Sequence, residues 1–99
     1  MKVVAVTACP TGVAHTYMAA EQLEKTAKTL GHAIKVETQG AIGIENELSD
    51  GDIQAADAVI FATDIEVERG ERFEGKMILR VPVQEAIKNP AGVFAKLKN

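Results

Sequence analysis

The hydrophobic pattern of the chain alternates between short apolar runs and longer amphipathic stretches. Residues 2–7 and 58–63 are continuous apolar runs that contain β-branched side chains. Such runs are typical of strands that are covered on both faces in a parallel sheet. Residues 33–38 alternate with period two, which predicts a half-exposed strand at a sheet edge. Residues 77–81 predict a fourth strand, which Pro82 ends because proline cannot donate to the sheet.

Helical periodicity fills the segments between these strands. From residue 13 to residue 30, apolar and small side chains recur at spacings of three and four, which predicts an amphipathic helix. Residues 48–56 predict a short helix that has Ser49 or Asp50 at its start. Residues 83–98 predict two helical pieces with a break between them.

The alternation of strands and helices predicts an α/β fold, a three-layer α/β/α sandwich with a four-stranded parallel sheet in the order 2-1-3-4. A chain of 99 residues is short enough for residues 1–99 to form a single domain. In such sheets ligands bind outside the carboxyl ends of the strands. Four polar side chains follow such ends, namely Cys9, Thr38, Gln39 and Asp64. We therefore expect one site at this edge of the sheet.

Composition excludes several classes of function. No apolar run approaches the roughly 20 residues of a membrane span, so we expect no direct membrane insertion. A net charge of −3 without a cluster of basic and aromatic residues argues against nucleic acid. The first residues lack the features of a signal peptide, so we expect a cytoplasmic protein. One cysteine and two distant histidines cannot supply a zinc site, and no nucleotide-binding glycine motif occurs, so we expect no metal or cofactor.

The loop after the first predicted strand carries the only cysteine, Cys9. Backbone N–H groups at the start of the following helix point at this loop, and they stabilise a thiolate or a phosphoryl group carried on its sulfur. Pro10 sets the direction of the turn and Gly12 permits close approach of the backbone. The predicted phosphate-binding residues are Pro10, Thr11, Gly12, Val13, Ala14, His15 and Thr16. Cys9 is the predicted nucleophile.

Cysteine phosphatases have a comparable loop, in which an arginine grips the phosphate where this chain has His15. An imidazole cannot form the same bidentate clamp, so we expect weak stabilisation of hydrolysis. The alternatives that stay open are a low-molecular-weight cysteine phosphatase or arsenate-reductase-like enzyme, and a non-catalytic binding module that uses phosphorylated Cys9 as a signal.

Other residues have both functional and purely structural interpretations. Residues 66–76 predict a charged surface loop with a short helical turn, in which Arg72 either contacts the phosphoryl group or a partner, or forms a surface ion pair with Glu68 or Glu74. Together with Thr38, Gln39 and Asp64, this arginine is a possible border of the site. Tyr17 and Met18 are predicted to pack within the helix or to form a docking surface.

Several separated motifs resemble one protein family. The sequence of residues 9–20, CPTGVAHTYMAA, is followed in order by VETQG, FATD and RFEGK at residues 36–40, 61–64 and 72–76. These motifs resemble the fructose-type enzyme IIB domains of the bacterial phosphoenolpyruvate-dependent sugar phosphotransferase system.

The resemblance implies a phosphotransferase component with a phosphocysteine intermediate. Cys9 would accept a phosphoryl group from a phosphohistidine on a IIA partner and pass it to a sugar, fructose or a related one. A membrane IIC permease would hold that sugar, and the resemblance therefore implies a cytoplasmic location at the inner face of the membrane.

Overall fold

The computed structural model describes residues 1–10, 13–40 and 43–97. Three members of the predicted phosphate loop, Thr11, Gly12 and the side chain of Val13, lie outside the described residues. The remaining residues of that loop are described.

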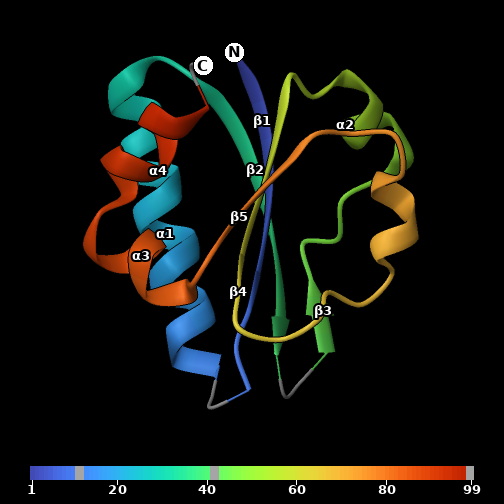
Figure 1. The fold of residues 1–99 in the computed structure, drawn as a ribbon, viewed down its shortest axis with the longest axis horizontal. Coiled ribbons are helices and arrows are strands. Elements are labelled where there is room, and N and C mark those ends of the chain that lie inside the picture. Colours follow the sequence, from blue (N-terminus) through green and yellow to red (C-terminus); the bar gives the residue numbers. More distant parts are fainter. Residues whose placement is uncertain (11–12, 41–42, 98–99) are drawn as a thin grey trace.

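A five-stranded sheet forms the centre of the molecule, with its strands in the order β3-β2-β1-β4-β5 (Figure 1). The strands are β1 (Lys2–Ala8), β2 (Ala33–Gly40), β3 (Gly43–Glu45), β4 (Ala58–Thr63) and β5 (Ile78–Val81). The pairs β1–β2, β1–β4 and β4–β5 are parallel, which confirms the predicted order of the four longer strands. The prediction of a purely parallel, four-stranded sheet was wrong, because β3 adds a fifth strand that is antiparallel to β2.

The carboxyl end of β2 also differs from its prediction as an edge strand. β3 pairs with Thr38, Gln39 and Gly40, so this part of β2 has strands on both sides. The side chains from Val36 to Gln39 are buried. Alternation therefore described the exposed first half of β2 correctly, but it failed where polar side chains are buried.

Helices cover both faces of the sheet, which confirms the three-layer architecture (Figure 1). One face carries α1 (Val13–Leu30), α3 (Val83–Lys88) and α4 (Pro90–Lys96). The other face carries α2 (Asp50–Ala55) and a short 3₁₀ helix, η1 (Gly70–Phe73).

Each face of the sheet has its own apolar layer. Because successive side chains of a strand point to opposite faces, Val3 and Ala5 of β1 pack toward α1, whereas Val4 and Val6 pack toward α2. Leu23 and Phe94 belong to the α1 layer, and the Phe61 and Phe73 rings meet edge to face at 5.0 Å in the α2 layer. Burial of each large apolar side chain contributes about 1.5–3 kcal/mol to the free energy of unfolding, so both layers stabilise the strand that precedes Cys9.

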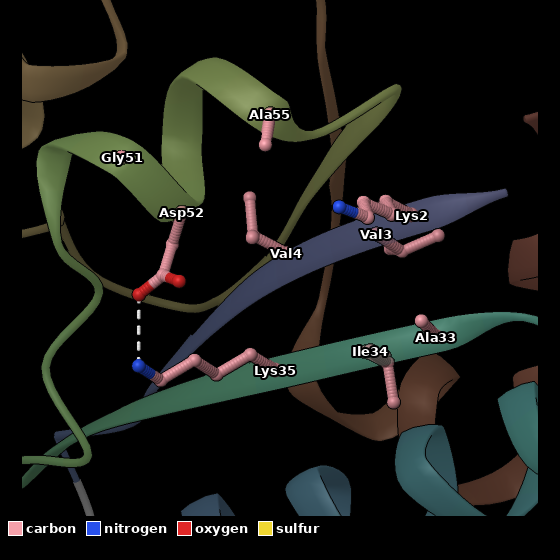
Figure 2. A pocket seen from close by; sticks show the side chains of 9 residues that line it. All are labelled: Lys2, Val3, Val4, Ala33, Ile34, Lys35, Gly51, Asp52 and Ala55. Carbon is pink, nitrogen blue, oxygen red and sulfur yellow. Dashed lines mark hydrogen bonds and ion pairs between the residues drawn. The ribbon is translucent and has the colours of Figure 1, made fainter.

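The start of α2 is fixed by a capping box. Ser49 Oγ accepts a hydrogen bond from the Asp52 backbone N–H at 3.0 Å, and Asp52 Oδ2 accepts one from the Ser49 N–H at 2.9 Å. Asp52 Oδ2 also lies 2.8 Å from Lys35 Nζ of β2, at the border of a pocket of about 220 Å³ (Figure 2). The hydrogen bonds from Lys35 and Ser49 lower the pKa of Asp52 to about 2.

Candidate functional site

Cys9 lies directly after β1 and is buried, with 7% of its surface exposed. The sheet register brings the ends of two neighbouring strands beside it, because Ala8 pairs with Gln39 of β2 and with Thr63 of β4. The backbone N–H of Asp64 donates to the Ala8 carbonyl at 3.1 Å. The predicted meeting of these strand ends at one edge of the sheet therefore agrees with the register.

His15 and Asp64 both approach the Cys9 sulfur. His15 Nδ1, in the first turn of α1, lies 3.9 Å from Cys9 Sγ. Asp64 Oδ2, just beyond β4, lies 3.9 Å from the same sulfur atom. The other carboxylate oxygen, Asp64 Oδ1, accepts a hydrogen bond from the Val83 backbone N–H at 3.2 Å. The sulfur is therefore flanked by an imidazole from one element and a carboxylate from another.

Thr16 connects the first turn of α1 to the strand that precedes Cys9. The Thr16 side chain is buried, and its carbonyl accepts a hydrogen bond from Thr7 Oγ1 at 3.1 Å. Pro10 and Ala14 are exposed at the surface of the loop. The start of α1 is thereby fixed relative to Cys9, as an anion cradle at a helix N-terminus requires.

The two predicted border residues of β2 lie on opposite faces of the sheet. Val36 belongs to the apolar layer under α1, as Cys9 does, so the alternation of the strand places Thr38 on the same face. Gln39 points to the other face, where its amide exchanges hydrogen bonds with the backbone of Glu68 at 2.8 and 3.0 Å. Thr38 therefore stays a possible member of the site, whereas the Gln39 side chain serves the opposite layer.

Arg72 also lies on the opposite face, within a buried ion pair. Its guanidinium contacts both carboxylate oxygens of Glu37, at 2.8 and 3.0 Å. The Arg72 side chain is 6% exposed and that of Glu37 is fully buried. The predicted surface pairing of Arg72 with Glu68 or Glu74 was wrong, because the long side chain reaches inward to a carboxylate on β2.

Hydrogen bonds keep Glu37 charged in this interior position. Burial by itself raises the pKa of the Glu37 carboxyl, but hydrogen bonds from Arg72, the Leu48 N–H and Gln39 outweigh burial and hold that pKa below its ordinary value of 4.5. The pKa of Arg72 is raised by the same hydrogen bonds to Glu37. Sequence analysis missed Glu37, and its one signal is an acidic residue within a predicted strand.

Exposed apolar side chains surround the Cys9 end of the molecule. Tyr17, Met18 and Ile65 are 41%, 50% and 44% exposed, and the Tyr17 hydroxyl donates to Glu45 of β3. The prediction that Tyr17 and Met18 pack within the helix was therefore wrong, since both side chains face outward from the first turns of α1. This surface is accessible to another molecule.

The described part of the chain has neither a metal-binding cluster nor a membrane-spanning helix. Within residues 1–10, 13–40 and 43–97, no group of three or more His, Cys, Asp or Glu side chains is arranged to hold a metal ion. In the same ranges, every helix is too short or too polar to cross a membrane.

Similar proteins connect this geometry to a family. Residues 4–96 match the family model described as the lactose/cellobiose-specific IIB subunit of the PTS system. The fructose-like EIIB component 2 of the PTS system in Escherichia coli K12 is 54% identical, over 98% of this chain and 92% of that protein. The fructose-specific EIIABC component of Bacillus subtilis is 51% identical over 99% of this chain, which corresponds to 15% of that longer protein.

A solved structure supports the same assignment. A domain of the fructose-specific IIABC component from Borrelia burgdorferi superposes with a TM-score of 0.92 and is 49% identical, covering 97% of this chain and 91% of that one. The chain therefore belongs to the IIB family of the sugar phosphotransferase system, among its fructose-type members.

Proposed function

We propose that Cys9 carries a phosphoryl group between a IIA phosphohistidine and a sugar. The observation that carries this proposal is the position of the Cys9 sulfur, buried at the junction of β1 and the N-terminus of α1, in a chain of the IIB family. Backbone N–H groups at a helix N-terminus favour an anion, so the same place suits a thiolate before transfer and phosphate oxygens after it.

The proposed reaction consists of two displacements at phosphorus. In the first, the Cys9 thiolate attacks the phosphoryl group, the S–P bond forms and the N–P bond to the donor histidine breaks. In the second, a sugar hydroxyl attacks, the O–P bond forms, its proton passes to a base, and the Cys9 thiolate leaves. No water takes part, and His15 and Asp64 lie beside the sulfur in both steps.

The partners follow from family membership and from the composition of longer relatives. The names of similar proteins combine IIB with IIC, or with IIA and IIC, in one chain. We infer a phosphohistidine donor of the IIA type and a membrane permease of the IIC type. The exposed side chains of Tyr17, Met18 and Ile65 offer both partners an apolar surface beside Cys9.

The same reasoning gives the substrate and the location. The relatives described here are named for fructose, so fructose or a related sugar is the proposed acceptor. The chain would act in the cytoplasm, at the inner face of the membrane where IIC presents the sugar. A hydrolytic cysteine phosphatase has no support in the family match or in the relatives.

Phosphorylation of the purified chain tests the proposal. The chain is incubated with phosphoenolpyruvate, the upstream phosphocarriers and a fructose-type IIA protein, and its intact mass is measured. We expect one added phosphate on Cys9, none in Cys9→Ser, and release of that phosphate to fructose when membranes with a matching IIC are added. An unmodified mass beside fully phosphorylated IIA contradicts the proposal.

A further inference from the structure

A negatively charged side chain faces the sulfur that the proposed function asks to carry phosphate. Asp64 Oδ2 lies 3.9 Å from Cys9 Sγ, and a phosphoryl group on that sulfur adds further negative charge beside it. A cradle built solely to stabilise phosphate has donors or cations at this position. The carboxylate therefore calls for an explanation.

Two backbone hydrogen bonds hold Asp64 in this place. Its own N–H donates to the Ala8 carbonyl at 3.1 Å, and its Oδ1 accepts from the Val83 N–H at the start of α3 at 3.2 Å. The residue is thus tied to β1, β4 and α3 together. The Asp64 carboxylate is therefore held beside the sulfur by the fold itself.

The groups around the sulfur act in opposite directions. The N-terminus of α1 favours negative charge on Cys9, and an N–H on His15 Nδ1, 3.9 Å from the sulfur, acts in the same direction. Asp64 opposes negative charge from the side of β4. Thr38, on the same face of β2, is uncharged. The stability of a phosphorylated Cys9 is therefore a balance between the helix and the imidazole on one side and the carboxylate on the other.

We propose that Asp64 is a counter-charge that destabilises phosphorylated Cys9 and so keeps its phosphoryl group ready for transfer to the next acceptor. This inference rests on the proposed function. A relay protein has to release the group as readily as it accepts it, because an intermediate that is too stable slows the second displacement. A role as the base for the Cys9 thiol suits Asp64 poorly, since an aspartate is a far weaker base than a thiolate.

The variant Asp64→Asn tests the charge without removing the hydrogen-bond acceptor for Val83. Purified phosphorylated IIA is equilibrated with the chain, and the phosphorylated fraction of each protein is measured by intact mass. Two like charges about 4 Å apart change an equilibrium by about fivefold even at the dielectric constant of bulk water, and by more near a protein surface, so we expect Asp64→Asn to accumulate at least about fivefold more phosphocysteine relative to phosphorylated IIA. We expect onward transfer to the sugar to slow in the same variant.

A second readout does not depend on any partner. The rate of Cys9 alkylation by iodoacetamide is measured against pH, and in Asp64→Asn the profile is expected to move by about half a unit or more toward lower pH, because the thiolate loses a like charge. Asp57→Asn is the matched control. Asp57 lies at the opposite end of the sheet, where its carboxylate accepts from the Lys2 N–H, and its loss is expected to move neither measurement.

The outcomes separate the two proposals. If the unmodified chain takes no phosphate from IIA, the proposed function fails, and the alkylation profile still decides whether Asp64 acts on the sulfur. The role of Asp64 is overturned if the unmodified chain is phosphorylated and Asp64→Asn behaves as it does. Both the ratio of phosphocysteine to phosphorylated IIA and the alkylation rate at each pH would then agree within about twofold between the two proteins. Should Asp64→Asn fold poorly, Asp64→Ser takes its place under the same criteria, since its hydroxyl also accepts a hydrogen bond.

Discussion

At the scale of single residues, Glu37 and Arg72 connect β2 by hydrogen bonds to two loops, one before α2 and one before η1. Glu37 Oε1 accepts from the Leu48 N–H at 2.9 Å, and Arg72 donates to the Arg69 carbonyl at 2.7 Å and to the Leu48 carbonyl at 3.3 Å. Gln39 adds a hydrogen bond to Glu37 at 2.7 Å. A buried network of this kind is stabilising only while every member has its partners.

Removing one charge of this pair is predicted to be costly. Arg72→Met leaves the Glu37 carboxylate buried without its cation, and loss of one partner of such a pair lowers the free energy of unfolding by about 3–5 kcal/mol. Urea denaturation followed by circular dichroism measures the loss. Arg69→Met is the matched control, because Arg69 forms an exposed ion pair with Glu47, for which we expect a loss below about 1 kcal/mol. Equal losses in the two variants refute the prediction.

The sequence contains limited information about this network. The alternation of β2 predicts an exposed Glu37, and nothing local indicates that a loop more than thirty positions later returns to cover it. Cys9 and Asp64, by contrast, could be predicted to meet, because parallel strands bring their carboxyl ends to one edge. Contacts between side chains at the ends of neighbouring strands can be predicted from the strand order. Contacts that depend on the path of a loop, such as that of Arg72 with Glu37, cannot be predicted in this way.

At the scale of elements, the capping box of α2 has a predictable response to acid. The pKa of Asp52 is about 2, below its ordinary value of 3.8, because Lys35 and Ser49 donate hydrogen bonds to its carboxylate. Because this pKa is lower in the folded chain than in the unfolded chain, the ionised Asp52 raises the free energy of unfolding at pH values above 3.8. This contribution is lost as the pH falls from 3.8 toward 2.

The variant Asp52→Asn is therefore expected to be less stable than the unmodified chain at neutral pH, and the difference is expected to narrow between pH 3.8 and pH 2. The urea midpoints of both proteins are measured at pH values of about 6, 4, 3 and 2. The difference between the two midpoints at each pH removes the effect of the other carboxylates, because these titrate in both proteins. Glu24→Gln, at an exposed position on α1, serves as the comparison. A difference that stays constant across this range contradicts the assignment.

Elements were predictable in proportion to their length. The helical periodicity of α1 extends over many residues, and β1 and β4 are continuous apolar runs. These patterns predicted both the type and the position of each of the three elements. β3 has three residues, which is too few for a periodic signal, and it forms because the chain after β2 turns back on that strand. The Asn89-Pro90 pair was predicted as a break and serves as one, with the Asn89 side chain accepting from the Gly92 N–H at the start of α4.

At the scale of the whole molecule, the site and the chain ends lie at opposite poles. β1 runs from Lys2 at one end of the sheet to Ala8 at the other, and Cys9 follows directly. Leu97 borders a pocket with Ala58 at the start of β4, and Ala58 pairs with Val3 of β1. The N and C labels lie at the same end of the sheet in Figure 1. A domain joined to either end therefore attaches far from Cys9.

This polarity predicts that fusions at the termini are tolerated. A folded domain joined to the amino or the carboxyl end through a flexible linker is expected to leave the rate of Cys9 phosphorylation by IIA within about twofold of the unfused chain, because the proposed partner surface of Tyr17, Met18 and Ile65 stays uncovered. Met18→Arg provides the contrast, since an exposed apolar residue on that surface is replaced by a charge. We expect it to slow the same reaction by about tenfold while the urea midpoint hardly changes. Slow phosphorylation of both terminal fusions, with Met18→Arg unaffected, would show that the partner approaches from the other pole.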